Sequence, residues 1–342
     1  MIIKAFSRKT AAAALLAISI FSAAVIVTPS VINTAAKPAQ EEKKFIKWVE
    51  FNVTAAAMEQ AYKIDLKAHE EGKSASWTEL LAYLGARYGG DFSRYRADDL
   101  KKLTEQLDSG KTMEEITSGM KYYPYYREAY GAVLDGFVGE FSIETADGDG
   151  KSAPVKKYGL KVFSPIARGY SYSHFDDFGS SRSYGYRRKH LGHDLMGGIG
   201  TPIIAVESGT VEAAGWNQYG GWRIGIRSFD KKRYYYYAHL RKDHPYCDIY
   251  EGQTVTAGDC IGYLGMTGYS SKENVNNINT PHLHYGLQLI FDESQKDGSN
   301  EIWIDMYEIT KFLETRRSEV VKDKESGEYY RKYQLFEKNT EE

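Results

Sequence analysis

Between residues 45 and 140, apolar positions recur at intervals of three and four along the chain, which is the spacing of an amphipathic helix. Ser76 precedes one of these runs, Glu79 follows three positions later as in a capping box, and a glycine pair ends the run at Gly90. The pattern predicts a region of four or five helices, which we interpret as an accessory domain. The runs cover residues 51–72, 76–90, 96–110, 112–120 and 122–141.

From about residue 141 the pattern changes to short β-prone runs, separated by glycine-containing turns every eight to twelve residues. This spacing predicts a mostly antiparallel β-sheet domain over about residues 155–315, so the expected fold class is α+β. Residues 316–342 are dense in charge, and we expect them to form a peripheral or partly disordered tail. The predicted strands lie within residues 201–216, 222–230, 233–240, 252–265 and 282–292.

The first residues of the chain have the pattern of an export signal. Lys4, Arg8 and Lys9 precede an uncharged apolar run that extends to about residue 28. Polar and small residues follow around Ala36. The run has a length between that of a signal-peptide core and that of a short membrane span. Residues 1–36 are therefore either a cleaved signal peptide or a membrane anchor, and in both cases the positive-inside rule places the remainder outside the cytoplasm.

Composition narrows the classes of partner. The chain has 342 residues, room for about two domains, and its formal net charge of −2 gives no basic field that would attract nucleic acid. Its two cysteines, Cys247 and Cys260, do not have the spacing of a zinc-binding pair. A disulfide between them and a pair of buried thiols both stay open at this point.

Seven of the eight histidines lie in the predicted β domain. In "TPHLHYG", strand alternation places His282 and His284 on one face of the sheet, with Cα atoms about 7 Å apart. Two imidazoles at this spacing can contribute to one small site. One can bind a metal ion, and the other can accept or donate a proton. His239 ends another predicted strand, in "YYYYAHL", and it is a further candidate for the same site.

The stretch "KHLGHDLMGG" supplies more candidate ligands, because His190, His193 and Asp194 fall within five positions. Three protein ligands with one open position are the arrangement of a catalytic zinc site, whereas a structural site closes all four positions. The residue types alone leave open which of the three side chains would bind a metal.

Four blocks, "HLGHDLMGGIGTPIIAVESGTVEAAGW", "YYAHL", "EGQTVTAGDCIGYLGMTGYS" and "TPHLHYGL", together resemble the lysostaphin/LytM-type zinc metalloendopeptidases, which are peptidoglycan hydrolases. The resemblance covers about residues 160–292, in the order and spacing of that family. It implies that His190 and Asp194, from the motif H-x-x-x-D, and His284, from H-x-H, are the ligands of one Zn²⁺ per active site. His193 stands at a variable position of the first motif, so the resemblance makes it a bystander.

The resemblance also implies the chemistry. His239 and His282 would be catalytic histidines in a groove-shaped active site, where zinc-activated water hydrolyses peptide bonds of peptidoglycan. The implied partners are peptidoglycan peptides and, if residues 1–36 are not cleaved, the membrane; the implied location is the extracellular face of the membrane or the cell wall. Tyr184 or Tyr186 could donate a hydrogen bond to the reaction intermediate or could simply pack on the sheet.

Two other functions stay open from the sequence. Some proteins built on this fold act as non-hydrolytic scaffolds or regulators of the cell envelope after they have lost ligands, although the ligand set is complete in this chain. The second open function is that of an exported peptidase that cleaves proteins instead of the cell wall. The polar loop at residues 268–280, before the H-x-H strand, is a candidate determinant of specificity.

Overall fold

The computed structural model describes residues 45–146, 152–298 and 300–337. The chain divides into residues 1–44 and one compact unit formed by residues 45–342. The predicted signal peptide or anchor, residues 1–36, lies outside the described residues. Within the described ranges, no helix combines the length and the apolar character needed to cross a membrane.

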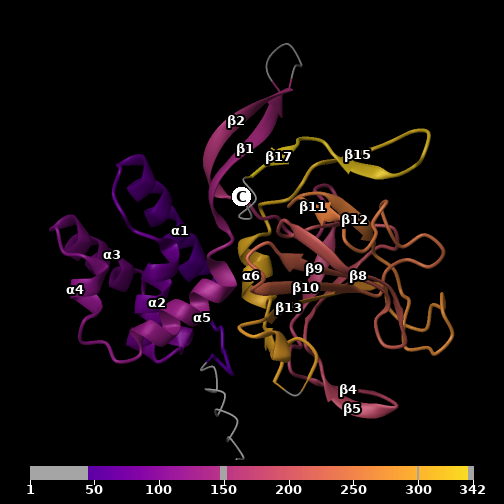
Figure 1. Cartoon of the computed structure of the whole chain (residues 1–342), viewed down its shortest axis with the longest axis horizontal. Coiled ribbons are helices and arrows are strands. Elements are labelled where there is room, and N and C mark those ends of the chain that lie inside the picture. The colour runs from indigo at the N-terminus through magenta and orange to yellow at the C-terminus, as the bar shows by residue number, and fades with distance from the viewer. Residues whose placement is uncertain (1–44, 147–151, 299, 338–342) are drawn as a thin grey trace, which may run out of the picture. The chain divides into compact units, whose positions relative to one another are not determined.

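Helices occupy the region in which the apolar period predicts them (Figure 1). Thr54 caps the first of them, because its hydroxyl oxygen accepts a hydrogen bond from the Ala57 amide at 3.3 Å. That these helices make up an accessory domain stays a prediction. The helices are α1 (Ala55–Glu70), α2 (Trp77–Tyr88), η1 (Phe92–Arg94), α3 (Ala97–Asp108), α4 (Met113–Thr117), α5 (Tyr123–Leu134), η2 (Glu293–Gln295) and α6 (Tyr307–Phe312).

The main sheet of the described residues has eight strands, and all of its pairings are antiparallel, which confirms the predicted sheet type (Figure 1). Its strand order is β11-β8-β9-β10-β13-β6-β3, and β14 pairs with β13 off this path. The strands are β3 (Tyr172–Phe175), β6 (His193–Gly197), β8 (Gly209–Asn217), β9 (Gly221–Ser228), β10 (Arg233–Ala238), β11 (Thr254–Val255), β13 (His282–Leu289) and β14 (Ile302–Ile304).

Smaller sheets surround the main one. A hairpin of β1 and β2 follows α5 directly, so the region predicted as helical to residue 141 ends at Leu134. The smaller sheets contain β1 (Val138–Ala146), β2 (Ser152–Leu160), β4 (Ser181–Tyr184), β5 (Tyr186–Lys189), β7 (Pro202–Ile204), β12 (Cys260–Tyr263), β15 (Val320–Lys322), β16 (Tyr329–Arg331) and β17 (Leu335–Phe336).

The charged C-terminal stretch contains ordered strands. β17 pairs with β1, and β15 pairs with β16. Arg331 is buried, and its guanidinium donates to the carbonyl oxygens of Ala257 at 2.7 Å and Leu335 at 3.1 Å. Charge density predicted a peripheral tail because it describes side chains alone. The pairing of β17 depends on β1, about 200 positions earlier in the chain, and composition cannot reveal such a partner.

The two faces of the main sheet have different roles. Tyr235 and Tyr237 on β10 are fully buried in the core, while Tyr234 and Tyr236 point to the opposite face, which borders a cavity. The helices and the sheet share one cluster of buried apolar residues. Buried Arg233 reinforces this junction, because its guanidinium donates to the Ala132 carbonyl at 2.9 Å.

Candidate metal centre

Strand register brings the motif residues together. β13 pairs with β6 so that His284 lies directly opposite Asp194, and Ala238 of β10 lies opposite His284 on the other side. His190 precedes β6 and reaches the same point from the turn at Gly192. Residues that the sequence separates by more than ninety positions are therefore neighbours on one face of the sheet.

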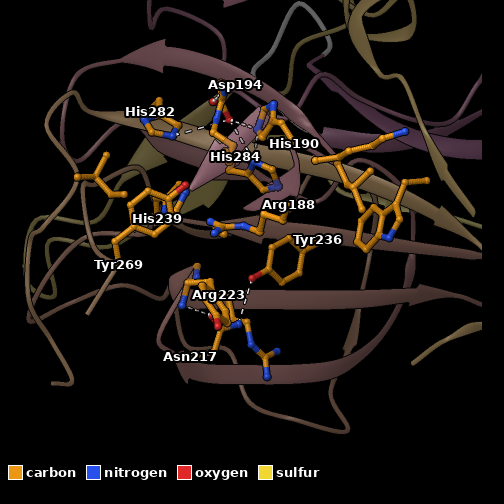
Figure 2. A pocket seen from close by; sticks show the side chains of 18 of the residues that line it. Arg188, His190, Asp194, Asn217, Arg223, Tyr236, His239, Tyr269, His282 and His284 are labelled. Atoms are coloured by element: carbon orange, nitrogen blue, oxygen red, sulfur yellow. Dashed lines mark hydrogen bonds and ion pairs between the residues drawn. The ribbon is translucent and has the colours of Figure 1, made fainter. Parts of the chain in front are cut away.

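The ligand atoms of His190, Asp194 and His284 converge on one point (Figure 2). His190 Nε2 lies 3.0 Å from Asp194 Oδ1 and 2.8 Å from His284 Nδ1, and His284 Nδ1 lies 3.1 Å from Asp194 Oδ1. Ligands at the tetrahedral positions around zinc lie roughly 3.3 Å apart, given the usual zinc–nitrogen bond length. Two imidazole nitrogens and a carboxylate oxygen in a triangle of this size fit three ligand positions of one zinc ion and leave a fourth open.

The charges of the site favour ionised Asp194. Burial alone would raise the pKa of this carboxyl group, but hydrogen bonds from His190 and His284 hold it far below its usual range. Burial lowers the pKa of His284, so that its ring is neutral at pH 7 and can offer a lone pair to a metal. Asp194 and His284 are therefore in the protonation states that metal binding requires.

A carboxylate lies behind the first histidine. Asp177 Oδ1 is 2.9 Å from His190 Nδ1, at ion-pair distance although without the direction of a hydrogen bond. Arg182 pairs with the other oxygen of Asp177, and its guanidinium also lies 3.5 Å from Asp194 Oδ2. Such outer partners commonly fix the orientation of metal-binding histidines. Neither Asp177 nor Arg182 belongs to the sequence motifs, so only the tertiary structure identifies them.

His239 and His282 lie beside this triangle with defined ring orientations (Figure 2). The Nδ1 atoms face the carbonyl oxygens of Thr267 and Thr280, respectively, at 2.8 Å each. A carbonyl can only accept, so each Nδ1 carries the proton and each Nε2 keeps a lone pair in the neutral ring. His282 Nε2 lies 3.7 Å from Asp194 Oδ1, and the centroids of the two catalytic candidates' rings are 4.8 Å apart.

The backbone around His239 is unusual. This residue has φ of 61°, in the left-handed region that non-glycine residues rarely adopt, and its amide donates to the Gly220 carbonyl at 2.7 Å. Gly268, with φ of 124°, passes so close that a Cβ on it would lie 3.0 Å from His239 Nδ1. Burial lowers the pKa of His239 well below its usual value, which keeps the ring neutral.

All five predicted site residues line one cavity of about 790 Å³ on the open face of the sheet. The structure thus brings the five predicted residues together, although their catalytic roles stay a prediction. His193 is placed differently: alternation along β6 turns its ring to the other face, where its Nε2 lies 2.9 Å from His174 Nδ1. Tyr184 stacks on Tyr269 with ring centroids 5.2 Å apart, within an aromatic cluster at the cavity rim.

Comparisons with known proteins agree with this geometry. The model of peptidase family M23 matches residues 188–297. Over 123 residues the chain is 41% identical to the L-Ala–D-Glu endopeptidase of Bacillus subtilis, a match that covers 36% of each protein. Lysostaphin of Staphylococcus simulans is 39% identical over 97 residues, which are 28% of this chain and 17% of lysostaphin.

A solved LytM structure from Ruminococcus gnavus has a TM-score of 0.51 at 22% identity, over 80% of this chain and 92% of that one, which shows a shared fold. The matched segment spans about a third or less of the two curated relatives. The family match includes both histidine motifs and all of the strands between them, with His239 after β10. The chain therefore contains, over residues 188–297, a domain of peptidase family M23 that is homologous to those of lysostaphin and the L-Ala–D-Glu endopeptidase.

Proposed function

We propose that this protein is a zinc-dependent endopeptidase that hydrolyses peptide bonds of bacterial peptidoglycan outside the cytoplasm. One observation carries the proposal: the ligand atoms of His190, Asp194 and His284 form a single triangle, and the free Nε2 atoms of two further histidines border it. The family match supports the reaction class, because the relatives are named as peptidoglycan endopeptidases and metalloproteases.

His190, Asp194 and His284 would hold the zinc ion. Zinc in this position supplies two effects, the polarisation of the scissile carbonyl and a lowered pKa for water. Asp177, at ion-pair distance from His190, would keep the ring of that ligand in place. The bound peptide would lie along the open face of the sheet, because the cavity runs across β13, β10 and β9 there.

His239 and His282 would move the protons. Each ring has its Nδ1 proton fixed on a threonine carbonyl, so Nε2 can accept a proton from water. The same atom can then release the proton to the nitrogen of the leaving amine. His239 is suited to accept first, since burial keeps its ring neutral at pH 7. In their protonated forms, the two rings would also stabilise negative charge on the reacting carbonyl oxygen.

The bond that is cut differs among the relatives by name: L-Ala–D-Glu in one, glycyl-glycine in another, and a DD-peptide bond in a third. We therefore propose peptidoglycan peptides as the substrate class. The N-terminal pattern of charge and apolar residues supports export of the chain, as a secreted or membrane-anchored enzyme.

The proposal is tested with the full chain after export, with added zinc, on purified peptidoglycan and on protein substrates. The wild-type protein should release new amino groups from peptidoglycan and bind one zinc ion per chain. His284→Ala should lose both zinc and activity. His239→Ala should keep zinc and the circular dichroism spectrum of the wild type, while kcat falls about 100- to 10,000-fold.

Three results would count against this function. Zinc-loaded, folded wild-type protein that is inert on peptidoglycan from several bacteria would contradict it. Hydrolysis of proteins with no action on peptidoglycan would assign a different substrate class. A cellular phenotype that survives both His239→Ala and His282→Ala would indicate a scaffold function instead.

A further inference from the structure

One wall of the cavity presents an arginine, Arg188, that has no acidic partner among the residues that the structure describes. The guanidinium carbon of Arg188 lies 5.0 Å from the ring centroid of Tyr219 and 5.1 Å from that of Tyr269, so both rings hold it by cation–π contact. Its Nη1 atom is buried and has no hydrogen-bond partner among the described residues. Leaving a buried charged donor unsatisfied is costly, which indicates that Arg188 is positioned for a ligand.

A second arginine reaches the same cavity from the sheet. Arg223 lies on β9 next to Ile224, whose register partner is Tyr237 of β10. Its Nε atom is likewise buried without a hydrogen-bond partner among the residues described. Tyr236 lies between the two arginines (Figure 2). Burial raises the pKa of the Tyr236 hydroxyl, while the positive charges of Arg223 and Arg188 act in the opposite direction.

The Tyr236 hydroxyl has a proton to donate. Its oxygen accepts a hydrogen bond from Asn217 Nδ2 at 3.2 Å. The amide of Asn217 cannot turn over, because its oxygen accepts from the backbone amides of Tyr219 at 3.0 Å and Gly220 at 2.6 Å. Within the described chain the Tyr236 hydroxyl donates to no acceptor, so this proton is free for a ligand.

We propose that Arg188, Arg223 and Tyr236 bind a free carboxylate of the substrate peptide and thereby select anionic peptides. This inference rests on the proposed endopeptidase function, and it names the substrate class of that same site. A carboxylate has two oxygens and can accept from both guanidinium groups and the hydroxyl at once. An uncharged glycine bridge offers no such group and would leave both arginines unpaired.

The other charged residues of the cavity support this reading. Arg182 is already paired with Asp177. At the far end of the cavity, Glu212 is paired with Lys296, and Glu301 accepts from Trp303 Nε1 at 2.8 Å. Lys189 and Asp297 also line the cavity. Among the cavity arginines of the described chain, the buried nitrogens without a hydrogen-bond partner belong to Arg188 and Arg223, on either side of Tyr236.

The distance to the metal site places the carboxylate near the scissile bond. The ring centroids of Tyr236 and His284 are 5.9 Å apart. An extended peptide advances by about 3.3–3.6 Å per residue, so the carboxylate would belong to a residue one or two positions from the bond that is cut. Two sources have this chemistry, the α-carboxylate of a γ-linked Glu residue and the carboxylate at the end of a short stem peptide.

Three stem peptides of one sequence distinguish these sources: the free acid, the α-carboxamide of the γ-linked Glu residue, and the C-terminal carboxamide. With zinc-loaded wild type, we expect kcat/KM to fall about 10- to 100-fold on the amide that removes the recognised carboxylate. The double variant Arg188→Gln/Arg223→Gln should cleave that amide and the acid at equal, low rates. Arg187→Gln changes an exposed arginine of the same strand that does not line the cavity, and it should keep the wild-type preference.

A binding measurement separates this inference from the proposed function. Calorimetry with the zinc-loaded His239→Ala variant should show the same preference for the acid over one amide. One outcome is that the protein binds the acid more tightly than one amide, but wild type cleaves neither peptide nor peptidoglycan. That outcome would contradict the endopeptidase function and support carboxylate recognition. If wild type cleaves the acid and both amides at rates within twofold, and binds them equally, carboxylate recognition is overturned while the endopeptidase function stands.

Discussion

A Cβ atom on Gly192 would lie 2.5 Å from Cε1 and 2.6 Å from Nε2 of His284, so the backbone at Gly192 lies directly against the imidazole ring. The ring of His284 can present Nδ1 to the metal triangle only because position 192 has no side chain. Gly192→Ala should therefore displace the ring and lower the affinity for zinc about 10- to 100-fold, as loss of an outer contact does at other metal sites. Competition titration with a zinc-binding dye measures this.

Gly198→Ala is the matched control for this prediction. It lies in the same stretch, "KHLGHDLMGG", and the nearest atom to a Cβ there would be Thr201 Oγ1 at 3.8 Å. We expect unchanged zinc affinity. Equal affinities for all three proteins would show that Gly192 does not fix the position of His284.

His193 should prove unnecessary for metal binding. Its ring packs against His174 and Tyr307 on the other face of the sheet, and burial lowers its pKa to about 3. His193→Ala should bind one zinc ion per chain, with a loss of stability from packing alone, whereas His190→Ala should bind none. Zinc content after dialysis, measured by atomic emission, decides between the two residues. Zinc lost by the first variant and kept by the second would reverse the assignment.

Glu207 neutralises the buried guanidinium of Arg233. Both of its carboxylate oxygens accept from Arg233, at 2.7 and 2.9 Å, and Tyr235 Oη donates to one of them at 2.6 Å. Glu207→Gln should lower the free energy of unfolding by about 3 kcal/mol, because it leaves the buried guanidinium with only the partly exposed Asp230 as an acidic partner. Chemical denaturation measures the change. Glu319→Gln weakens the exposed ion pairs with Arg168 and Lys332 and should cost less than about 1 kcal/mol. Similar losses for the two variants would contradict the prediction.

Asp230, a second partner of Arg233, makes the stability of the folded protein depend on pH. Burial alone would raise the pKa of its carboxyl group, but Arg233 and a hydrogen bond from Ser228 hold it below its usual value. Its stabilising effect is therefore complete above the unfolded-state pKa of about 3.9 and is lost as the pH falls through the lower folded-state value. Asp230→Asn should be less stable than wild type at pH 7, and the difference should shrink below about pH 4. Unfolding curves at several pH values test this; a difference that grows with acid would refute it.

Cys247 and Cys260 should form a disulfide once the chain reaches an oxidising compartment. Their sulfur atoms lie 2.7 Å apart, and the Cys247 amide donates to the Ile261 carbonyl at 3.2 Å. The bond would close a short loop and stabilise the fold by about 3 kcal/mol. Intact mass after alkylation, with and without reductant, should reveal two reactive thiols only after reduction. Protein exported in oxidising medium that carries two free thiols would exclude the bond.

The local pattern of apolar and polar residues predicted most of the secondary structure of this protein. The three-to-four period located the helices, and the two-residue period placed His282 and His284 on one face of a strand. Both periods follow from backbone geometry within a single element, so they are readable without any knowledge of partners. The boundary at Leu134, where helix gives way to the β1–β2 hairpin, was not readable, because the pairing of β1 depends on β2 and on distant β17.

The sequence by itself determined the residue types of the site, their spacing, and the resemblance that singled out five of them. The pairing of His284 with Asp194, the carbonyl contacts that fix His239 and His282, and the contact between Gly192 and His284 were decided by tertiary structure. Tertiary structure also decided that Arg188 and Arg223 both lie near Tyr236. The physical reason is that side-chain direction repeats locally along a strand, whereas register and the approach of loops are set by packing between segments far apart in the chain.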